Sequence, residues 1–417
     1  MDADVKEGRR TGPVTNRQRH KPLLQWMADG DPDLVPVLLD DPFSTAASYF
    51  GVPVRAEGAS GSTSAHTGPP PVTVDMVLQC SRELGIPFHV GLGSVTPFDA
   101  IEFLDTIELS VEEKVEPDRV LRSTTLRTPA GTMTELFVTP AGLPACWLEH
   151  LVKSEADLPA LAYLVENASR AMLEDVRVRA RLVAKFKSEI GRWPQWMSFS
   201  AVIGVPAFNL TSNLYVDPAN AFYLLHDHTV EMERLFELEG QAAAVAVACA
   251  AEAGADIVRG AINGLELYSP QIYRKYFVPQ ARALHDEAHK HGLMSWVHTC
   301  GHMKKLIEMG IYEPMGVDIL ESLAAPPLGT VDDLKDARAK LGHHITTRGA
   351  VNVSDFYDRN LEHIRLRTRY VLEATRGYRH MVGDTNASFP PYPRDGLLAV
   401  VEEVRNSGRM FDINDYL

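Results

Sequence analysis

Hydrophobic and polar residues follow two alternating patterns through the second half of the chain. Short apolar runs rich in β-branched residues predict buried strands, and longer stretches with apolar residues three or four positions apart predict amphipathic helices. The predicted strands are residues 196–203, 255–259, 293–298, 317–323, 344–350 and 378–383. The predicted helices are residues 219–254, 270–292, 303–309, 331–341, 354–377 and 394–407. This regular succession requires parallel strands covered by helices.

Two α/β architectures satisfy that pattern, a (β/α)8 barrel and an open doubly wound sheet. Several predicted helices end at a glycine just before the next strand, as at Gly254 and Gly292, which is a common helix stop. No Gly-x-Gly-x-x-Gly turn and no Gly-x-x-x-x-Gly-Lys-Ser/Thr loop follows a predicted strand. The number of strands and the chain length favour a (β/α)8 TIM barrel with an N-terminal extension.

The first half of the chain is less regular. Residues 56–71 are rich in Gly, Ser and Pro, a composition typical of a mobile loop. Residues 107–139 have a β-like pattern that predicts a hairpin with its turn near residues 129–131. We therefore divide the chain into an N-terminal extension, residues 1–74, and a barrel domain, residues 75–417, from which the hairpin is an excursion.

The most informative short stretch is Trp-Val-His-Thr-Cys-Gly-His, residues 296–302, at the end of a predicted strand. Alternate side chains of a strand point the same way, so His298 and Cys300 face together. An imidazole beside a thiol forms half of a zinc site. His302 extends the series, although Gly301 breaks the strand before it. The alternative is a pair of packed residues without a metal.

Other polar residues stand at predicted strand ends, where barrel enzymes carry their functional groups. Arg259 can hold an anionic group, or pair with an acid on a neighbouring strand. Glu321 is a candidate metal ligand or substrate contact, with a structural salt bridge as the alternative. Arg348 lies near the end of the next predicted strand, residues 344–350. Asp384 and Asn386 follow the last strand and are candidate substrate-binding residues, although Asp and Asn commonly form turns there.

Composition and charge narrow the classes of function. The chain has 417 residues, of which 45% are apolar and 23% charged, as is typical of globular proteins. The net charge of −14 is spread along the chain and argues against nucleic acid or an anionic membrane as a partner, because both bind Lys/Arg clusters. We find no signal sequence and no run of the roughly 20 apolar residues that span a membrane. The four cysteines are far apart, so we expect a reduced, cytoplasmic protein.

Several segments resemble the uroporphyrinogen decarboxylase-like superfamily, and the resemblance covers nearly the whole chain. Its most specific part is Val-His-Thr-Cys-Gly, residues 297–301, and it closes with Phe-Pro-Pro-Tyr-Pro, residues 389–393. The matching segments are residues 15–37, 128–135, 149–158, 254–256, 268–270, 297–301, 348–350 and 389–393. The resemblance implies a (β/α)8 barrel that is either a tetrapyrrole decarboxylase or a methyltransferase working with a corrinoid protein.

The chain departs from the family pattern in two places. The first departure favours the methyltransferase branch, and the second removes an expected ligand from the metal site of that branch. True decarboxylases of the family carry Arg-Gln-Ala-Gly-Arg near the N-terminus, whereas this chain has Arg17-Gln-Arg19 with no Ala-Gly-Arg after it. Thiol-activating methyltransferases carry a second cysteine just before a Pro-Pro pair, and Ala387 stands at that place here. The candidates to replace that cysteine as a metal ligand are Asp384, Glu321 and His302.

The resemblance implies a methyltransferase that moves a methyl group between a small substrate and a corrinoid, or from a methyl-corrinoid to a thiol or pterin. Zinc at His298 and Cys300 would supply Lewis-acid activation. We recognise no corrinoid-binding segment, so the corrinoid would arrive on a separate protein, and the family implies a homodimer. The alternatives are a metal-independent decarboxylase or lyase of a small carboxylic acid and a non-catalytic ligand-binding barrel.

Overall fold

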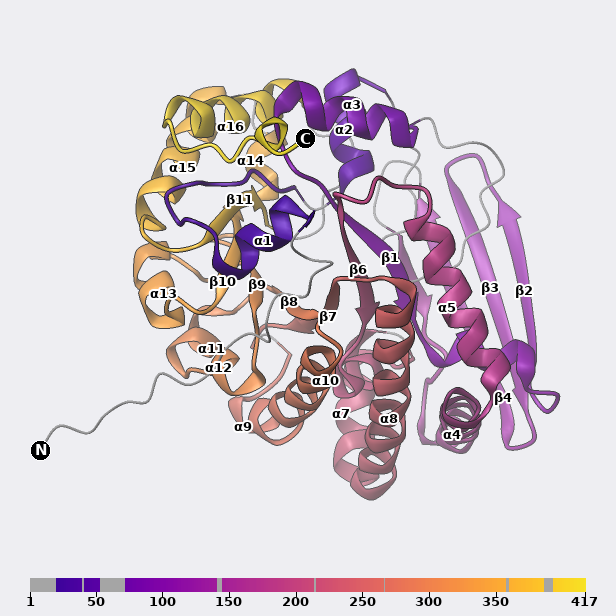
Figure 1. Ribbon diagram of the computed structural model, residues 1–417. Coiled ribbons are helices and arrows are strands. Elements are labelled where there is room, and N and C mark those ends of the chain that lie inside the picture. The colour runs from indigo at the N-terminus through magenta and orange to yellow at the C-terminus, as the bar shows by residue number, and fades with distance from the viewer. Residues whose placement is uncertain are drawn as a thin grey trace, which may run out of the picture.

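The computed structural model describes residues 20–39, 41–52, 72–140, 145–213, 215–265, 267–357, 360–385 and 393–417. Its main sheet has parallel strands in the order β1-β6-β7-β8-β9-β10-β11. These are β1 (His89–Val95), β6 (Ser198–Ile203), β7 (Ile257–Asn263), β8 (Met294–Cys300), β9 (Ile319–Ser322), β10 (Thr346–Val351) and β11 (His380–Asp384). Helices cover the outside of this curved sheet (Figure 1), so the predicted α/β architecture is confirmed. The loop predicted at residues 56–71 lies outside the described residues.

Residues 35–38 continue the ring of strands beyond β11. Val37 pairs in parallel with Val382, and the Leu38 amide donates to the Val382 carbonyl oxygen at 2.9 Å. The Val382 amide in turn donates to the Pro36 carbonyl oxygen at 2.9 Å. This segment takes the eighth position of a (β/α)8 barrel, the predicted fold. Among the described residues no backbone ladder joins it to β1.

Helix α1 (Pro22–Asp29) covers the N-terminal end of the barrel and lies across the middle of the ring of strands in Figure 1. Its Met27 carbonyl oxygen accepts a 2.9 Å hydrogen bond from Thr346 Oγ1 at the start of β10. Just before the helix, Lys21 forms a buried ion pair with Asp256 at 2.5 Å. We call the apolar cluster beneath α1 the barrel floor; it includes Leu23, Leu24, Trp26, Met27, Ile257, Met294, Trp296, Ile319 and Met381.

The outer helices follow the predicted ranges, with breaks that the periodicity does not reveal. The longer ones are α2 (Pro42–Phe50), α3 (Val74–Leu84), α4 (Leu158–Glu174), α5 (Val176–Ile190), α7 (Pro218–Asp227), α8 (Thr229–Ala253), α10 (Val278–Lys290), α13 (Leu334–Leu341), α15 (Leu361–Ala374) and α16 (Arg394–Asn406). Shorter pieces are α6 (Pro206–Phe208), α9 (Pro270–Ile272), α11 (Lys304–Glu308), α12 (Tyr312–Met315) and α14 (Val353–Tyr357). None of the described helices is long and apolar enough to span a membrane.

The prediction of one helix over residues 219–254 is wrong, because the chain turns between α7 and α8. His228 separates the two helices with φ −123° and ψ 40°. Neither glycine nor proline marks this position, and apolar residues continue at helical spacing on both sides. Periodicity alone therefore could not locate the break.

The predicted hairpin is confirmed and belongs to a larger antiparallel sheet that projects from the barrel (Figure 1). This second sheet has the order β2-β3-β4-β5 and consists of β2 (Glu108–Val115), β3 (Arg119–Thr128), β4 (Gly131–Pro140) and β5 (Cys146–Glu149). Leu126 and Met133 are opposite each other in its centre and are buried. One face therefore packs against the body of the protein, where α4 lies against β3 and β4.

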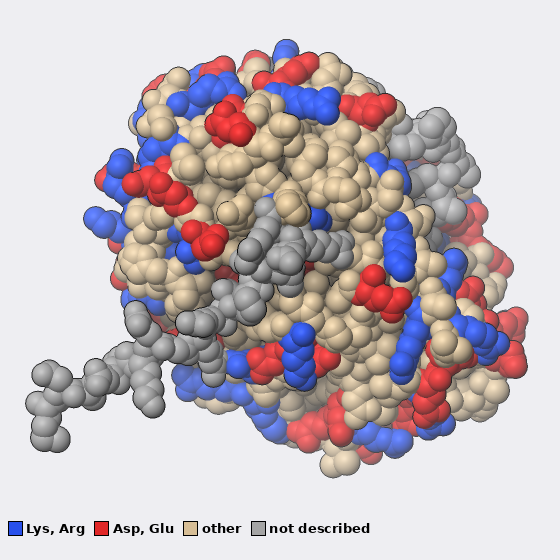
Figure 2. Space-filling model, in the orientation of Figure 1, with Lys and Arg blue, Asp and Glu red and all other residues tan. Residues whose placement is uncertain are grey.

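Charged residues of both signs are spread over the face of the molecule that Figure 2 shows. Neither sign gathers into one continuous patch there.

Candidate active site

Side chains from strands β7 to β11 come together inside the barrel and form a set of ionisable groups. Arg259 starts lowest, in the first half of β7 and in register with Trp296, and its side chain reaches Glu321. In the register of the parallel sheet, His298 on β8 is paired with Glu321 on β9, and Glu321 with Arg348 on β10. Parallel register thus places three residues from three neighbouring strands at the same height. We call the connected set the mouth network; its members are Arg259, His298, Cys300, Glu321, Arg348 and Asp384.

His298 and Cys300 lie on the same side of β8, as their spacing predicts. His298 Nε2 is 2.8 Å from Cys300 Sγ, so the two groups are in direct contact. On the other side of the imidazole, Nδ1 is 2.9 Å from Glu321 Oε1. The His298 side chain is 15% exposed and that of Glu321 is completely buried. The ring is therefore fixed at both nitrogens, with the thiol on one and the carboxylate on the other.

Glu321 is the centre of the mouth network. Its Oε1 also accepts from Arg259 Nη2, and its Oε2 accepts from Arg348 Nη1 at 2.6 Å. Burial by itself raises the pKa of Glu321, but the charges of Arg259 and Arg348 hold that pKa well below its usual range, with a further contribution from His298. The carboxylate is therefore ionised in spite of its complete burial, because two guanidinium groups share it.

Arg348 links the network to the beginning of the chain. Its Nη2 donates to Asp384 Oδ1 on β11, and its Nε donates to the Leu38 carbonyl oxygen at 2.8 Å. Gly383 makes this approach possible, since a Cβ at that position would lie 2.2 Å from the same carbonyl oxygen and 3.1 Å from Arg348 Nε. The arginine therefore ties β9, β11 and residues 35–38 together.

The charge state of His298 follows from its two neighbours. Burial alone lowers the pKa of His298, but Cys300 and Glu321 raise it to about 10. In the metal-free protein the imidazole is therefore protonated at neutral pH. A metal that binds at Nε2 must first displace that proton, so metal binding at this site is coupled to proton release.

The donor set of His298 and Cys300 suits zinc as half of a site. Two ligands of one tetrahedral zinc lie about 3.5 Å apart when Zn–N and Zn–S distances are ordinary. The observed 2.8 Å between Nε2 and Sγ requires only a small opening. Among the described residues, no group of three His, Cys, Asp or Glu side chains surrounds a common point. His298 and Cys300 thus supply two of the three protein ligands of an ordinary catalytic zinc site, and the described residues place no third beside them.

The other candidate residues occupy different places. Glu321 faces Nδ1 of His298 rather than the side of the ring that carries the thiol, and Asp384 faces Arg348. His302 is exposed in the turn before α11, where its carbonyl oxygen accepts from the Leu265 amide at 3.1 Å. Asn386, like Ala387, lies outside the described residues.

Sequence reasoning missed two contributors to this site. It gave no role to Arg348, whose signal was a single charge in an otherwise uncharged strand, where a buried guanidinium needs acidic partners. It also gave no role to Trp296. The centroid of its ring lies 5.4 Å from Arg259 Cζ, so the ring stabilises that guanidinium by a cation–π contact. Directly below, His89 contacts Ser198 and Ser200 through its two ring nitrogens, at 2.9 Å and 2.7 Å.

Comparison with known proteins places this arrangement in a family. The model of the uroporphyrinogen decarboxylase (URO-D) family matches residues 188–407. The chain belongs to the uroporphyrinogen decarboxylase family. The matched stretch contains strands β6 to β11 and every member of the mouth network. The predicted family is therefore confirmed, and its most specific segment, residues 297–301, lies at the centre of the candidate site.

Two solved structures illustrate what the chain is similar to. A methyltransferase from Methanosarcina mazei has a TM-score of 0.59 and 14% sequence identity, and the match covers 93% of this chain and 98% of that one. A B12-independent methionine synthase from Shewanella sp. W3-18-1 has a TM-score of 0.42 and 15% identity, with 90% and 98% covered. No curated protein matches the sequence significantly. At 14% identity the likeness to the methyltransferase from Methanosarcina mazei shows the fold alone.

Proposed function

We propose that this protein is a methyltransferase that moves a methyl group between a small substrate and a corrinoid, or from a methyl-corrinoid to a thiol or pterin. The observation that carries the proposal is the contact of His298 Nε2 with Cys300 Sγ at 2.8 Å, at the C-terminal end of the barrel. The methyltransferase from Methanosarcina mazei, which shares the fold over 93% of this chain, is consistent with it. The corrinoid would be brought by a separate protein.

His298 Nε2 and Cys300 Sγ would hold zinc, which as a Lewis acid stabilises a thiolate or polarises the methyl donor. Glu321 accepts a hydrogen bond from His298 Nδ1, and this keeps the proton on Nδ1 and aims Nε2 at Cys300. Arg259 and Arg348 keep Glu321 ionised. The chain thus positions the imidazole through a carboxylate that is itself held by two cations.

The paired arginines favour methyl transfer over the decarboxylase alternative. A decarboxylase of a small acid needs cations directed at the carboxylates of its substrate. Arg259 is bound to Glu321, and Arg348 to Glu321 and Asp384. Two guanidinium groups therefore face two carboxylates of the protein itself, and their charges are balanced within the mouth network.

Elemental analysis of the full-length protein, purified without an affinity tag, tests this proposal. We expect stoichiometric zinc in the wild-type protein and its loss in His298→Ala and in Cys300→Ser. The matched controls are Cys146→Ser, an exposed cysteine on β5, and His226→Ala, whose side chain is 88% exposed; both should keep the metal. His302→Ala asks separately whether that residue is a third ligand.

A methyl-transfer assay with free methylcobalamin and a thiol acceptor, followed by the change in corrinoid absorbance, provides the functional readout. We expect turnover in the wild-type protein and both controls and none in the two site variants. A metal-free wild-type protein, or zinc that survives both His298→Ala and Cys300→Ser, would overturn the proposal. Decarboxylation of a small acid by the metal-free protein would support the alternative instead.

A further inference from the structure

The antiparallel sheet beside the barrel ends in a long exposed strand. In the order β2-β3-β4-β5, strand β2 pairs only with β3 among the described strands. Each residue from Glu108 to Val115 is exposed. A strand edge of this length offers unpaired amides and carbonyls to another strand. Edge strands are commonly protected by proline, a bulge, a covering loop or charged side chains. Strand β2 contains no proline and pairs with β3 without a bulge, but it carries the charged residues Glu108, Glu112, Glu113 and Lys114, so its charges decide which strands it can accept.

Three large apolar side chains of β2 lie on one face of the sheet and are exposed. Leu109, Val111 and Val115 are 40%, 50% and 78% exposed. Their odd-numbered positions share the face of the buried Leu126 and Met133, because Leu109 is opposite Leu126 and Leu126 is opposite Met133. The face that is covered in the centre of the sheet therefore continues uncovered to its edge, where Glu113 interrupts the apolar residues between Val111 and Val115.

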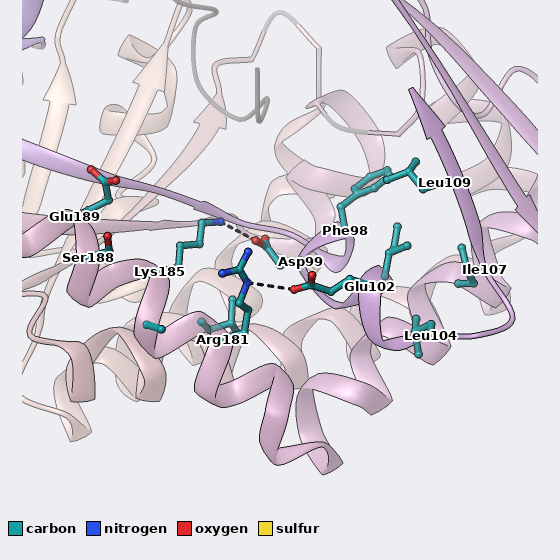
Figure 3. Close-up of a pocket in the computed structure, with 13 residues that line it drawn as sticks. Phe98, Asp99, Glu102, Leu104, Ile107, Leu109, Arg181, Lys185, Ser188 and Glu189 are labelled. Carbon is teal, nitrogen blue, oxygen red and sulfur yellow. Dashed lines mark hydrogen bonds and ion pairs between the residues drawn. The ribbon is translucent and has the colours of Figure 1, made fainter. Parts of the chain in front are cut away.

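A groove runs beside this edge. It has a volume of about 910 Å³ and lies between β2, α5 and the short helix η2 (Pro97–Phe103). Figure 3 shows apolar side chains, Phe98, Leu104, Ile107 and Leu109, on the side of the groove near β2. On the other side, two ion pairs join α5 to η2: Lys185 with Asp99 at 2.7 Å and Arg181 with Glu102 at 3.1 Å. A strand added to β2 would extend the apolar wall of this groove.

We propose that β2 is a dimerisation strand, on which a second copy of this chain adds its own β2 in antiparallel orientation with Val111 opposite the partner's Val111. Residues directly opposite in such a pair point to the same face. Val115 then falls opposite the partner's Ile107, at the edge of the groove. Val111 thus packs against its own copy, Val115 covers the edge of the buried Ile107, and Leu109 falls opposite the partner's Glu113. The two sheets then join into one continuous sheet.

The charges of β2 select this register and a partner with the same sequence. Centring the pair on Val111 sets Glu108 opposite the partner's Lys114, twice across the two-fold axis. No two like charges are then directly opposite. Centring on Ser110 would instead set Glu108 opposite the partner's Glu112, and like charges directly opposite are destabilising. Self-complementarity of this kind is what a two-fold interface between identical copies requires.

The present contacts of the two charged residues leave them available for this role. Glu108 Oε2 lies 3.6 Å from Arg127 Nε, and Lys114 Nζ lies 2.6 Å from Glu116 Oε1. The Glu108 and Lys114 side chains are 72% and 74% exposed. Ion pairs this exposed contribute little to stability, so either side chain can turn to a partner at small cost.

Sedimentation velocity of the full-length protein over micromolar concentrations tests the proposal. We expect the wild-type protein to be a dimer. Lys114→Glu sets Glu108 against a glutamate in both symmetric contacts, and Glu108→Lys sets Lys114 against a lysine. Each single variant should therefore raise the dimer dissociation constant about tenfold or more. The matched control is Lys340→Glu, which removes an exposed lysine on α13 paired with Asp336 and should leave the dimer intact.

Mixing the two single variants in equal amounts makes the test specific. In a mixed dimer every contact between positions 108 and 114 again joins opposite charges, so the mixture should dimerise as the wild-type protein does. This recovery also shows that both variants are folded. The proposal is overturned if the wild-type protein is a monomer throughout, if Lys114→Glu leaves its dimer unchanged, or if the mixture does not recover. None of these outcomes depends on zinc or on methyl transfer.

Discussion

The floor and the mouth of this barrel differ sharply although the same strands build both. On β8, Trp296 belongs to the floor, and two residues further on His298 belongs to the mouth network. On β9, Ile319 and Glu321 repeat this change. An advance of two residues along a strand keeps the side chain on the inner face but replaces apolar packing with hydrogen-bonded charge.

This difference reflects what covers each end. The floor lies under α1, whose apolar side chains fill the ring, and the ion pair of Lys21 with Asp256 beside it is completely buried. The mouth carries acids and bases whose charges are balanced against each other. Barrel proteins generally use the N-terminal end for stability and the C-terminal end for chemistry. The comparison predicts that substitutions at the two ends will change different properties.

Removal of Arg348 should have the largest effect on stability. Arg348→Met leaves Glu321 and Asp384 buried without their shared cation, and losing one partner of a buried ion pair costs about 3–5 kcal/mol. Urea denaturation of the metal-free protein measures this free energy of unfolding. Arg376→Met is the control, because its pair with Glu373 is exposed and should cost less than about 0.5 kcal/mol. Equal losses in the two variants would contradict the assignment of Arg348 to a buried network of ion pairs.

A cavity in the floor should lower stability without changing the mouth. Leu24 is 1% exposed, and Leu24→Ala should lower the free energy of unfolding by about 2–5 kcal/mol. Zinc content per folded molecule should stay at the wild-type value, since Leu24 lies on α1 at the N-terminal end of the barrel, whereas His298 and Cys300 lie near the C-terminal end of β8. Leu366→Ala, at a 56% exposed position on α15, is the control for stability. Loss of zinc from Leu24→Ala at a temperature where it is folded would show that the two ends are coupled.

Removal of the Glu321 charge should lower the zinc affinity as well as the stability, because the same carboxylate orients His298 and pairs with Arg259 and Arg348. Glu321→Gln keeps the shape of the side chain but removes the charge that fixes His298 Nδ1. We expect zinc affinity to fall by about 10- to 100-fold, as measured by competition with a chromophoric chelator. Glu308→Gln, on α11 and paired with Lys305, is the matched control. An unchanged zinc affinity in Glu321→Gln would rule out the orienting role.

Two buried histidines should have pKa values that are shifted in opposite directions from the ordinary value. The pKa of His298 is raised to about 10, because Cys300 and Glu321 outweigh the effect of burial. Burial, with a smaller contribution from the charge of Arg338, lowers the pKa of His380 at the start of β11 to about 3. At neutral pH the first should be protonated and the second neutral. Nitrogen-detected NMR of labelled, metal-free protein distinguishes these ring states directly.

The same two histidines should give stability opposite dependences on pH. The stability contributed by His298 is complete below its unfolded pKa of about 6.5 and is lost as pH rises through about 10. For His380 the contribution is complete above about 6.5 and is lost as pH falls toward 3. Each slope is at most about 1.4 kcal/mol per pH unit. His298→Gln should remove the alkaline slope alone, and His380→Gln the acidic one; a single variant that removed both would contradict this separation.

Much of the fold could be predicted from periodicity. The alternation from residue 196 onward gave the order of parallel strands, and the strand ends placed His298 and Glu321 at one end of the barrel. The prediction that Arg259 ends its strand is wrong, because β7 continues to Asn263. Periodicity failed at His228, where the helix breaks without a glycine or proline. It also gave no sign that residues 35–38 lie beside β11, because pairing between distant segments leaves no local pattern.

The candidate site was predictable in its parts and not in its connections. The spacing of His298 and Cys300 was enough to place imidazole and thiol together, because alternation within one strand is a local property. The sequence could not decide whether Glu321 is a metal ligand or part of a salt bridge. That choice depends on the neighbours that the register of β8, β9 and β10 supplies.

The sequence by itself determined an α/β barrel of this family and the pairing of His298 with Cys300 on one strand. Only the tertiary structure decided that Glu321 contacts the far side of the imidazole and that Arg348 joins it to Asp384 and to Leu38, 310 residues away in the chain. The reason is physical: side-chain direction within a strand follows from backbone geometry, whereas a buried charge is satisfied by whichever groups the packed sheet brings to it.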